Sequence, residues 1–88
     1  MPNGVAGRIR EWENRNPFRR WRKEHGITLS GACALMRVSQ ATVQKWEAGA
    51  AMPTDENMAR ITELTGNPRI ADEWAAWREE GARLRVDG

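Results

Sequence analysis

The stretch that decides the fold is Thr28-Leu-Ser-Gly-Ala-Cys-Ala-Leu-Met-Arg-Val-Ser-Gln-Ala-Thr-Val-Gln-Lys-Trp-Glu-Ala-Gly-Ala-Ala-Met-Pro53. It predicts two short helices, over residues 29–36 and 40–48, joined by a tight turn. Thr28 and Ser39 are good N-caps, because a side-chain hydroxyl accepts the free backbone N–H groups of the first helical turn. Gly49 is expected to end the second helix in a left-handed conformation.

Apolar side chains recur at helical spacing in both helices. Those expected to face inward are Ala32, Leu35, Met36, Val43 and Trp46, with Cys33 as a small apolar core residue. The remaining face of the second helix is short, polar and almost free of acid, and it comprises Gln40, Ala41, Thr42, Gln44 and Lys45. This composition is typical of a helix that lies against base edges and phosphates in a DNA major groove.

Helix signals also flank this pair. Asn16-Pro17 predicts the start of an earlier helix, which buries Phe18 and Trp21 and stops at Gly26. Thr54 is expected to cap a helix that ends at Gly66, with Met58, Ile61 and Leu64 facing inward.

Asn67-Pro68 repeats the cap-plus-proline entry and opens a last helix. Its apolar stripe is Ile70, Trp74, Trp77, Gly81 and Leu84, and Gly81 is expected to weaken the last turns. The two tryptophans either complete the core of one chain or form an exposed patch for a twofold dimer contact.

Residues 1–15 leave two alternatives open. Val5, Ile9 and Trp12 are spaced for a short amphipathic helix, whereas Gly4 and Gly7 favour a mobile basic arm. A basic arm could follow a DNA backbone or enter the minor groove, and the alternative is a solvated tail.

The chain is therefore predicted to be all-α, a compact bundle of about five short helices that contains a helix-turn-helix. Its expected parts are a basic arm or short helix over 1–15, the helix-turn-helix domain over 16–66 and a C-terminal helix over 67–88. With 88 residues there is room for one small domain, so the five tryptophans and Phe18 are important to its core.

Charge is distributed unevenly although the net charge is only +2. Residues 1–45 carry nine basic and three acidic side chains (+6), and residues 46–88 carry five basic and nine acidic ones (−4). A basic half that faces a polyanion and an acidic half that faces away would favour docking on DNA.

Several functional classes find no support in the sequence. The lone Cys33 and the lone His25 form no metal site or catalytic dyad, and no carboxylate pair or phosphate-binding glycine loop occurs. We therefore expect no enzyme activity, no metal and no cofactor. Because no long apolar run or secretory leader is present, a cytoplasmic protein without membrane contact is expected.

The turn and the end of the second helix resemble the lambda-repressor-like, Cro-type helix-turn-helix regulators of the xenobiotic-response-element group. Val38-Ser39 at the turn and Trp46-Glu47-Ala48-Gly49 before Pro53 carry this resemblance, which covers about residues 16–66. Three positions depart from the family pattern: Arg37 stands where a glycine is usual, Leu29 where a phosphate-binding residue is common, and Gly31 where an acid is usual. A non-glycine residue at position 37 needs either a strained left-handed backbone or a slightly different turn.

The resemblance implies which residues contact DNA and which are structural. It implies DNA contacts by Gln40, Ala41, Thr42, Gln44 and Lys45. Ser39 and Arg37 beside them, and Arg19, Arg22 and Lys23 on the helix that begins at Pro17, are further expected DNA-binding residues. Glu47 would repel phosphate, so we expect it to cap backbone N–H groups or to pair with an arginine of the helix that begins at Pro17. Trp46 is expected in the core.

The expected function is that of a small DNA-binding repressor, of the phage, mobile-element or antitoxin kind. Because one recognition helix reads only a few base pairs, we expect a homodimer on an inverted-repeat operator in double-stranded DNA. The expected interface comprises Ile70, Trp74, Trp77 and Leu84. The alternative is a protein-interaction adaptor, whose acidic, tryptophan-bearing C-terminal half binds a toxin, a polymerase subunit or another regulator.

Overall fold

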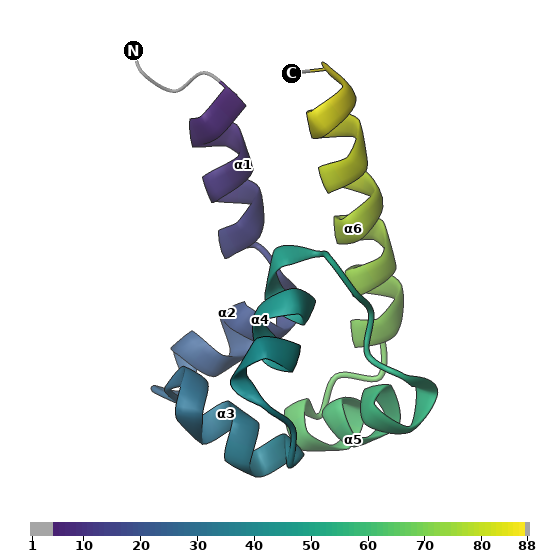
Figure 1. The fold of residues 1–88 in the computed structure, drawn as a ribbon. Coiled ribbons are helices and arrows are strands. Elements are labelled where there is room, and N and C mark those ends of the chain that lie inside the picture. The colour runs from purple at the N-terminus through teal and green to yellow at the C-terminus, as the bar shows by residue number, and fades with distance from the viewer. Residues whose placement is uncertain (1–4, 88) are drawn as a thin grey trace.

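The computed structural model describes residues 5–87, and all its regular elements in that range are helices (Figure 1). They are α1 (Val5–Asn14), α2 (Pro17–Glu24), α3 (Leu29–Met36), α4 (Gln40–Ala48), α5 (Asp55–Thr65) and α6 (Ile70–Asp87). The predicted all-α class is confirmed. The additional helix is α1, which forms within the segment where helix and arm were both considered; residues 1–4 lie outside the described range.

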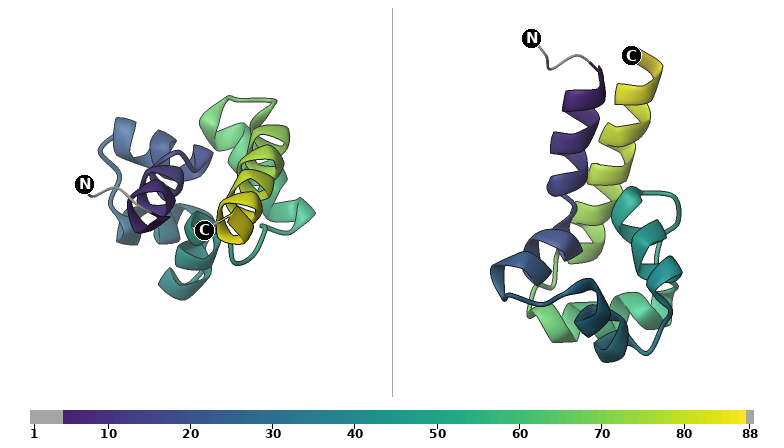
Figure 2. Two further views of the ribbon diagram at one scale, coloured as in Figure 1. Left: turned by 90° about the horizontal axis from the view of Figure 1, so that it is seen from above. Right: turned by 60° about the vertical axis from the view of Figure 1, so that its left-hand side comes forward.

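The helices form two parts of one elongated molecule. Helices α2 to α5 make a compact base, while α1 and α6 lie side by side and project from it (Figures 1 and 2). The start of α1 and the end of α6 are therefore at the same end of the molecule. The α3–α4 pair lies in the base, away from that end.

The predicted N-caps form as side-chain hydrogen bonds. Asn16, Thr28, Ser39 and Thr54 each accept the backbone N–H of the residue three positions on, at 2.9–3.2 Å. Gly26, Gly49 and Gly66 all adopt positive φ after their helices, as the sequence predicted for a left-handed helix end at Gly49. These local signals placed the bounds of α3 and α4 correctly.

The start of α6 differs from the prediction. The Asn67 side chain accepts the N–H of Arg69, only two residues on, at 3.0 Å. This interaction makes a local Asx turn rather than a helix cap. Pro68 therefore lies in a turn, and the helix begins at Ile70.

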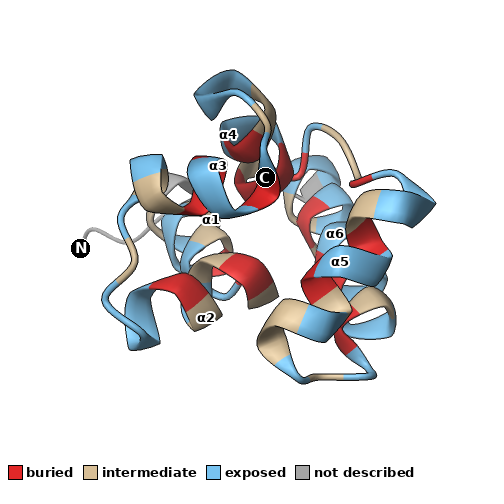
Figure 3. Cartoon of the chain, turned by 90° about the horizontal axis from the view of Figure 1, so that it is seen from below, coloured by how far each residue is buried: buried red, intermediate tan, exposed pale blue. Residues whose placement is uncertain are grey.

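The core lies where the base meets the projecting helices, and the buried faces of the base appear in Figure 3. Its buried apolar members are Trp12, Phe18, Ala32, Cys33, Met36, Val43, Trp46, Met58, Ile61, Ile70, Trp74 and Trp77. The expected inward positions of Cys33 and Trp46 are confirmed. Leu35 was expected to face inward but is 46% exposed, because α3 turns only Ala32, Cys33 and Met36 towards the core.

A reciprocal tryptophan pair joins α1 to α6. The indole Nε1–H of Trp12 donates to the backbone oxygen of Trp77 at 2.6 Å, and Nε1–H of Trp77 donates to the backbone oxygen of Trp12 at 2.5 Å. The two rings are stacked with centroids 4.1 Å apart and planes 5° from parallel. Each buried indole thus satisfies its only donor, and each ring covers the other.

Gly81 provides the space for this pair. A Cβ atom at position 81 would lie 2.1 Å from the Trp12 ring, closer than real Cβ atoms approach any heavy atom. Helix α6 continues through Gly81 to Asp87, so the predicted interruption is not seen. The glycine is explained by close packing of α1 on α6.

Within the described residues, no helix is long and apolar enough to cross a bilayer.

Replacing Gly81 with alanine tests this close packing. Alanine is a better helix former by about 1 kcal/mol, yet we expect Gly81→Ala to lower the free energy of unfolding by about 1–3 kcal/mol, because the methyl group displaces Trp12. The measurement is urea denaturation followed by tryptophan fluorescence. Gly31→Ala is the matched control, since its Cβ would meet only side-chain atoms at 3.3 Å and should be nearly neutral. Equal effects of both substitutions would contradict the role of Gly81.

Candidate nucleic-acid interface

The turn between α3 and α4 depends on one left-handed residue. Arg37 has φ 58° and ψ 45°, and it is the only non-glycine residue with positive φ among residues 5–87. Its backbone N–H bonds to the oxygen of Cys33, which ends α3. Val38 then packs against the core, and Ser39 caps α4. Of the two alternatives for position 37, the structure has the left-handed backbone, and the Arg37 side chain is exposed.

Helix α4 separates a buried face from a polar exposed one. Val43, Trp46 and Glu47 are buried. The exposed side chains are Gln40, Ala41, Gln44 and Lys45. They form two adjacent pairs four residues apart, about one helical turn, and so share one face. Because the only acid of this helix is buried, the exposed face offers hydrogen-bond donors and one positive charge without an opposing carboxylate.

Hydrogen bonds at the start of α4 hold its first turn. Thr42 is half-buried, and its Oγ1 lies 2.9 Å from the Oγ of Ser39, in addition to the cap of Ser39 on the Thr42 N–H. Both hydroxyl groups thus have structural roles. Gln40 donates from Nε2 to the Oγ of Ser30 at 3.3 Å, which joins the first residue of α4 to the first turn of α3.

A buried ion pair connects α2 to α4. Arg22 and Glu47 form a two-point bond, Nε to Oε2 and Nη2 to Oε1, both at 2.9 Å, and Nη1 of Arg22 also donates to the backbone oxygen of Ile27 at 3.1 Å. The hydrogen bonds with Glu47 raise the pKa of the Arg22 guanidinium above its ordinary value, although burial opposes the shift. The alternative that Glu47 pairs with an arginine of the helix beginning at Pro17 is confirmed.

Arg22 was predicted to contact DNA, and this prediction is corrected. Its side chain is only 9% exposed, and its donors are directed at Glu47 and Ile27. The sequence could not separate Arg22 from its basic neighbours, because its role depends on a partner 25 residues away.

The other two basic residues predicted on α2 remain accessible. Arg19 and Lys23 lie four residues apart on one side of the helix, with Arg22 between them. Lys23 is exposed, and Arg19 is half-buried with Nε on Asn14 at 3.3 Å and Nη1 on Glu47 at 3.4 Å.

A hollow of about 240 Å³ lies where α1, α2 and α4 meet. Arg10, Glu13 and Asn14 of α1 face Arg19 of α2 and Gln44 of α4 across it, and Leu29, Arg22, Glu47 and Ala48 complete its lining. The exposed face of α4 is thereby continuous with α1. The basic character of residues 1–15 was the only signal for this in the sequence, because the position of α1 is set by its contact with α6.

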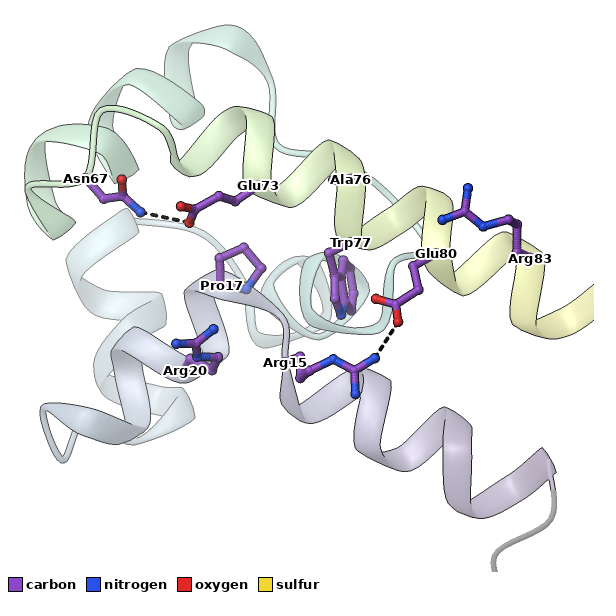
Figure 4. Close-up of a pocket in the computed structure, with 9 residues that line it drawn as sticks. All are labelled: Arg15, Pro17, Arg20, Asn67, Glu73, Ala76, Trp77, Glu80 and Arg83. Carbon is purple, nitrogen blue, oxygen red and sulfur yellow. Dashed lines mark hydrogen bonds and ion pairs between the residues drawn. The ribbon is translucent and has the colours of Figure 1, made fainter.

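A larger hollow, of about 630 Å³, lies between the α1–α2 corner and α6 (Figure 4). It contains the ion pair of Arg15 and Glu80, at 2.6 Å, and the hydrogen bond from Asn67 to Glu73, at 3.0 Å. None of its lining residues belongs to α3 or α4. Its acidic and basic groups already neutralise one another in part, so it is separate from the α4 face in both position and charge.

The residues predicted for a dimer or partner interface lie mostly in the core. Ile70, Trp74 and Trp77 are 1%, 0% and 5% exposed, so they fill the interior of a single chain and are not available to a partner surface. The buried Trp74 indole N–H has no hydrogen-bond partner among the described residues, although buried indole N–H groups usually have one. Leu84 is half-buried, and Val86 beyond it is 84% exposed.

Two capped helices joined by a left-handed turn, with the second helix exposing a polar face, define a helix-turn-helix DNA-binding domain. A helix-turn-helix family model matches residues 18–69. The chain belongs to the lambda-repressor/Cro-like helix-turn-helix family, whose domain is that of DNA-binding transcription regulators. No curated protein and no solved structure matches the chain. Helices α1 and α6 both lie entirely outside the family match.

Substituting glycine for Arg37 tests the strain at the turn. We expect Arg37→Gly to raise the free energy of unfolding by about 1 kcal/mol, because glycine adopts the left-handed conformation without a Cβ penalty. Gly66→Ala should lower the free energy of unfolding, since residue 66 has a left-handed φ of 69°. The space around its Cβ position is open, so backbone strain and not a steric clash would cause the loss. Thermal denaturation of the two variants gives both values. A loss of stability in Arg37→Gly would contradict the interpretation.

Removing one partner of the buried ion pair should lower the free energy of unfolding more than replacing both partners with apolar residues. We expect Glu47→Ala to lower the free energy of unfolding by about 3–5 kcal/mol, because Arg22 stays buried without its counter-charge. The double variant Arg22→Met/Glu47→Leu should be more stable than Glu47→Ala, since no uncompensated charge is left. Urea denaturation of the single and double variants gives the comparison. A double variant less stable than Glu47→Ala would show that the cost comes from lost packing instead.

Proposed function

We propose that this protein is a small sequence-specific repressor that reads the major groove of double-stranded DNA with α4. The observation that supports this most directly is the exposed face of α4, formed by Gln40, Ala41, Gln44 and Lys45. Amides pair with adenine edges, an ammonium group with guanine or phosphate, and a methyl group with the thymine methyl. Ser39 and Arg37 lie at the end of α4 that would enter the groove first.

The phosphate contacts are proposed for basic side chains beside this face. Arg19 and Lys23 on α2 and Arg37 in the turn are the accessible ones, whereas Arg22 holds Glu47. Contacts of this kind position the protein without reading sequence, and they make affinity fall steeply with salt.

A homodimer on an inverted repeat is part of the proposal. One helix of nine residues reads only a few base pairs, so useful affinity generally needs two half-sites about one DNA turn apart. The outer end of α6, where Leu84 is half-buried and Val86 is exposed, offers apolar surface for such a contact. Repression by occluding a promoter, in a phage, mobile-element or antitoxin setting in the bacterial cytoplasm, rests on analogy with the family.

The adaptor alternative loses its main support. It required tryptophans on an exposed acidic surface, but Trp74 and Trp77 are buried in the single chain. Acidic side chains on α6 remain exposed, and no apolar anchor accompanies them within the described part of that helix other than Val86 near its end.

Selection from random-sequence duplex DNA tests the proposed function. We expect the wild-type protein to enrich an inverted repeat, and Gln40→Ala/Lys45→Ala to lose that enrichment, because the two side chains supply donors to base edges. Fluorescence anisotropy on the enriched duplex should show weakening by roughly 10- to 100-fold in the double variant, at about 1–3 kcal/mol for a good base contact.

A matched control distinguishes the α4 face from charge in general. Arg69 is exposed near the start of α6, so Arg69→Ala removes one positive charge without touching α3 or α4 and should leave the enriched sequence unchanged. Binding that is weak, independent of sequence and equal in all variants would contradict the assignment of α4. Analytical ultracentrifugation of protein with and without the duplex tests the dimer.

A further inference from the structure

We infer that α1 extends the DNA-binding surface, with Arg10 and Arg19 holding one backbone phosphate in the hollow beside α4. This inference rests on the proposed function and adds a contact from a helix outside the family match. The hollow is lined by Arg10 from α1, Arg19 from α2 and Gln44 from the exposed face of α4. A phosphate seated there would lie beside a helix that occupies the groove.

The position of α1 is fixed by the opposite side of the helix. Trp12 is buried against α6 by stacking and two hydrogen bonds with Trp77. Arg10 is two residues earlier, about 200° around the helix axis, so it points away from α6. The tryptophan pair thus directs Arg10 towards α2 and α4, and α1 is not free to swing away from the hollow while the pair is intact.

Arg19 is held in place with binding capacity left over. Its Nε donates to Asn14 at 3.3 Å and its Nη1 to Glu47 at 3.4 Å. A guanidinium has five N–H groups arranged as a rigid fork, so further donors remain for an oxyanion. Within residues 5–87, Arg10 takes part in no ion pair, which leaves its charge available.

The charges around the hollow favour an anion. Glu47 is neutralised by Arg22, and Glu13 is the other acid of the lining. Arg10 and Arg19 therefore face a single unpaired carboxylate, which leaves the hollow net positive. Phosphate groups line both edges of the major groove, so a helix inserted in the groove has backbone phosphates on either side. The volume of the hollow, about 240 Å³, leaves room for a phosphate group of a nucleic-acid backbone.

Three variants test this site. Arg10→Ala should weaken binding by roughly tenfold on both the enriched duplex and a scrambled duplex, because a phosphate contact carries no sequence information. It should also reduce the slope of log affinity against log salt by about 0.9 per bound chain. Glu13→Gln should strengthen binding, since it removes the only unpaired carboxylate of the hollow.

Arg8→Ala is the matched control, because Arg8 lies on the same helix, carries the same charge and is about 200° from Arg10. It should leave the salt slope unchanged. Equal effects of Arg8→Ala and Arg10→Ala, or no effect of either, would overturn the site. Arg8 and Arg10 are both exposed, so circular dichroism should show that both variants retain the fold.

The experiment distinguishes this inference from the function on which it rests. If Gln40→Ala/Lys45→Ala abolishes sequence-specific binding while Arg10→Ala changes neither affinity nor salt slope, the α1 site is wrong and the recognition helix stands. If the wild-type chain binds neither duplex, both are overturned. If Arg10→Ala acts as expected while the double variant has no effect, α1 binds phosphate but α4 does not read sequence.

Discussion

The buried ion pair between Arg22 and Glu47 is the constraint on which the DNA-binding half of the molecule depends. It joins α2 to the last turn of α4 through two bonds of 2.9 Å. It also removes the only carboxylate of α4 from the exposed polar face of that helix. A single interaction therefore ties α4 to α2 and keeps the exposed face of α4 free of negative charge, while its two hydrogen bonds offset part of the desolvation cost of burying both groups.

Local signals in the sequence predicted much of the fold. The bounds of α3 and α4 followed from Thr28, Ser39 and Gly49, because caps act over three or four residues and their chemistry is visible in the chain itself. Asn67 shows the limit of such signals. An asparagine before a proline can cap a helix or close an Asx turn, and the choice depends on how the following chain packs.

What could not be predicted depends on contacts between distant residues. The burial of Arg22 requires Glu47, 25 residues on, and the position of α1 requires Trp77, 65 residues on from Trp12. The pattern of Ile70, Trp74 and Trp77 correctly placed all three on one stripe, but a stripe of this kind fits a core and an interface equally well. Only the packing of one chain shows that they are buried.

The tryptophan pair has a consequence for the order in which the chain folds. Helices α2 to α5 are joined by short connections, so their contacts form between neighbours in sequence and are expected to form rapidly. The stacking of Trp12 on Trp77 closes a loop of 65 residues, and its entropic cost is offset only once α6 is in place. Helix α1 is therefore the element that we expect to dock last and to detach first, as a cooperative unit separate from the helix-turn-helix.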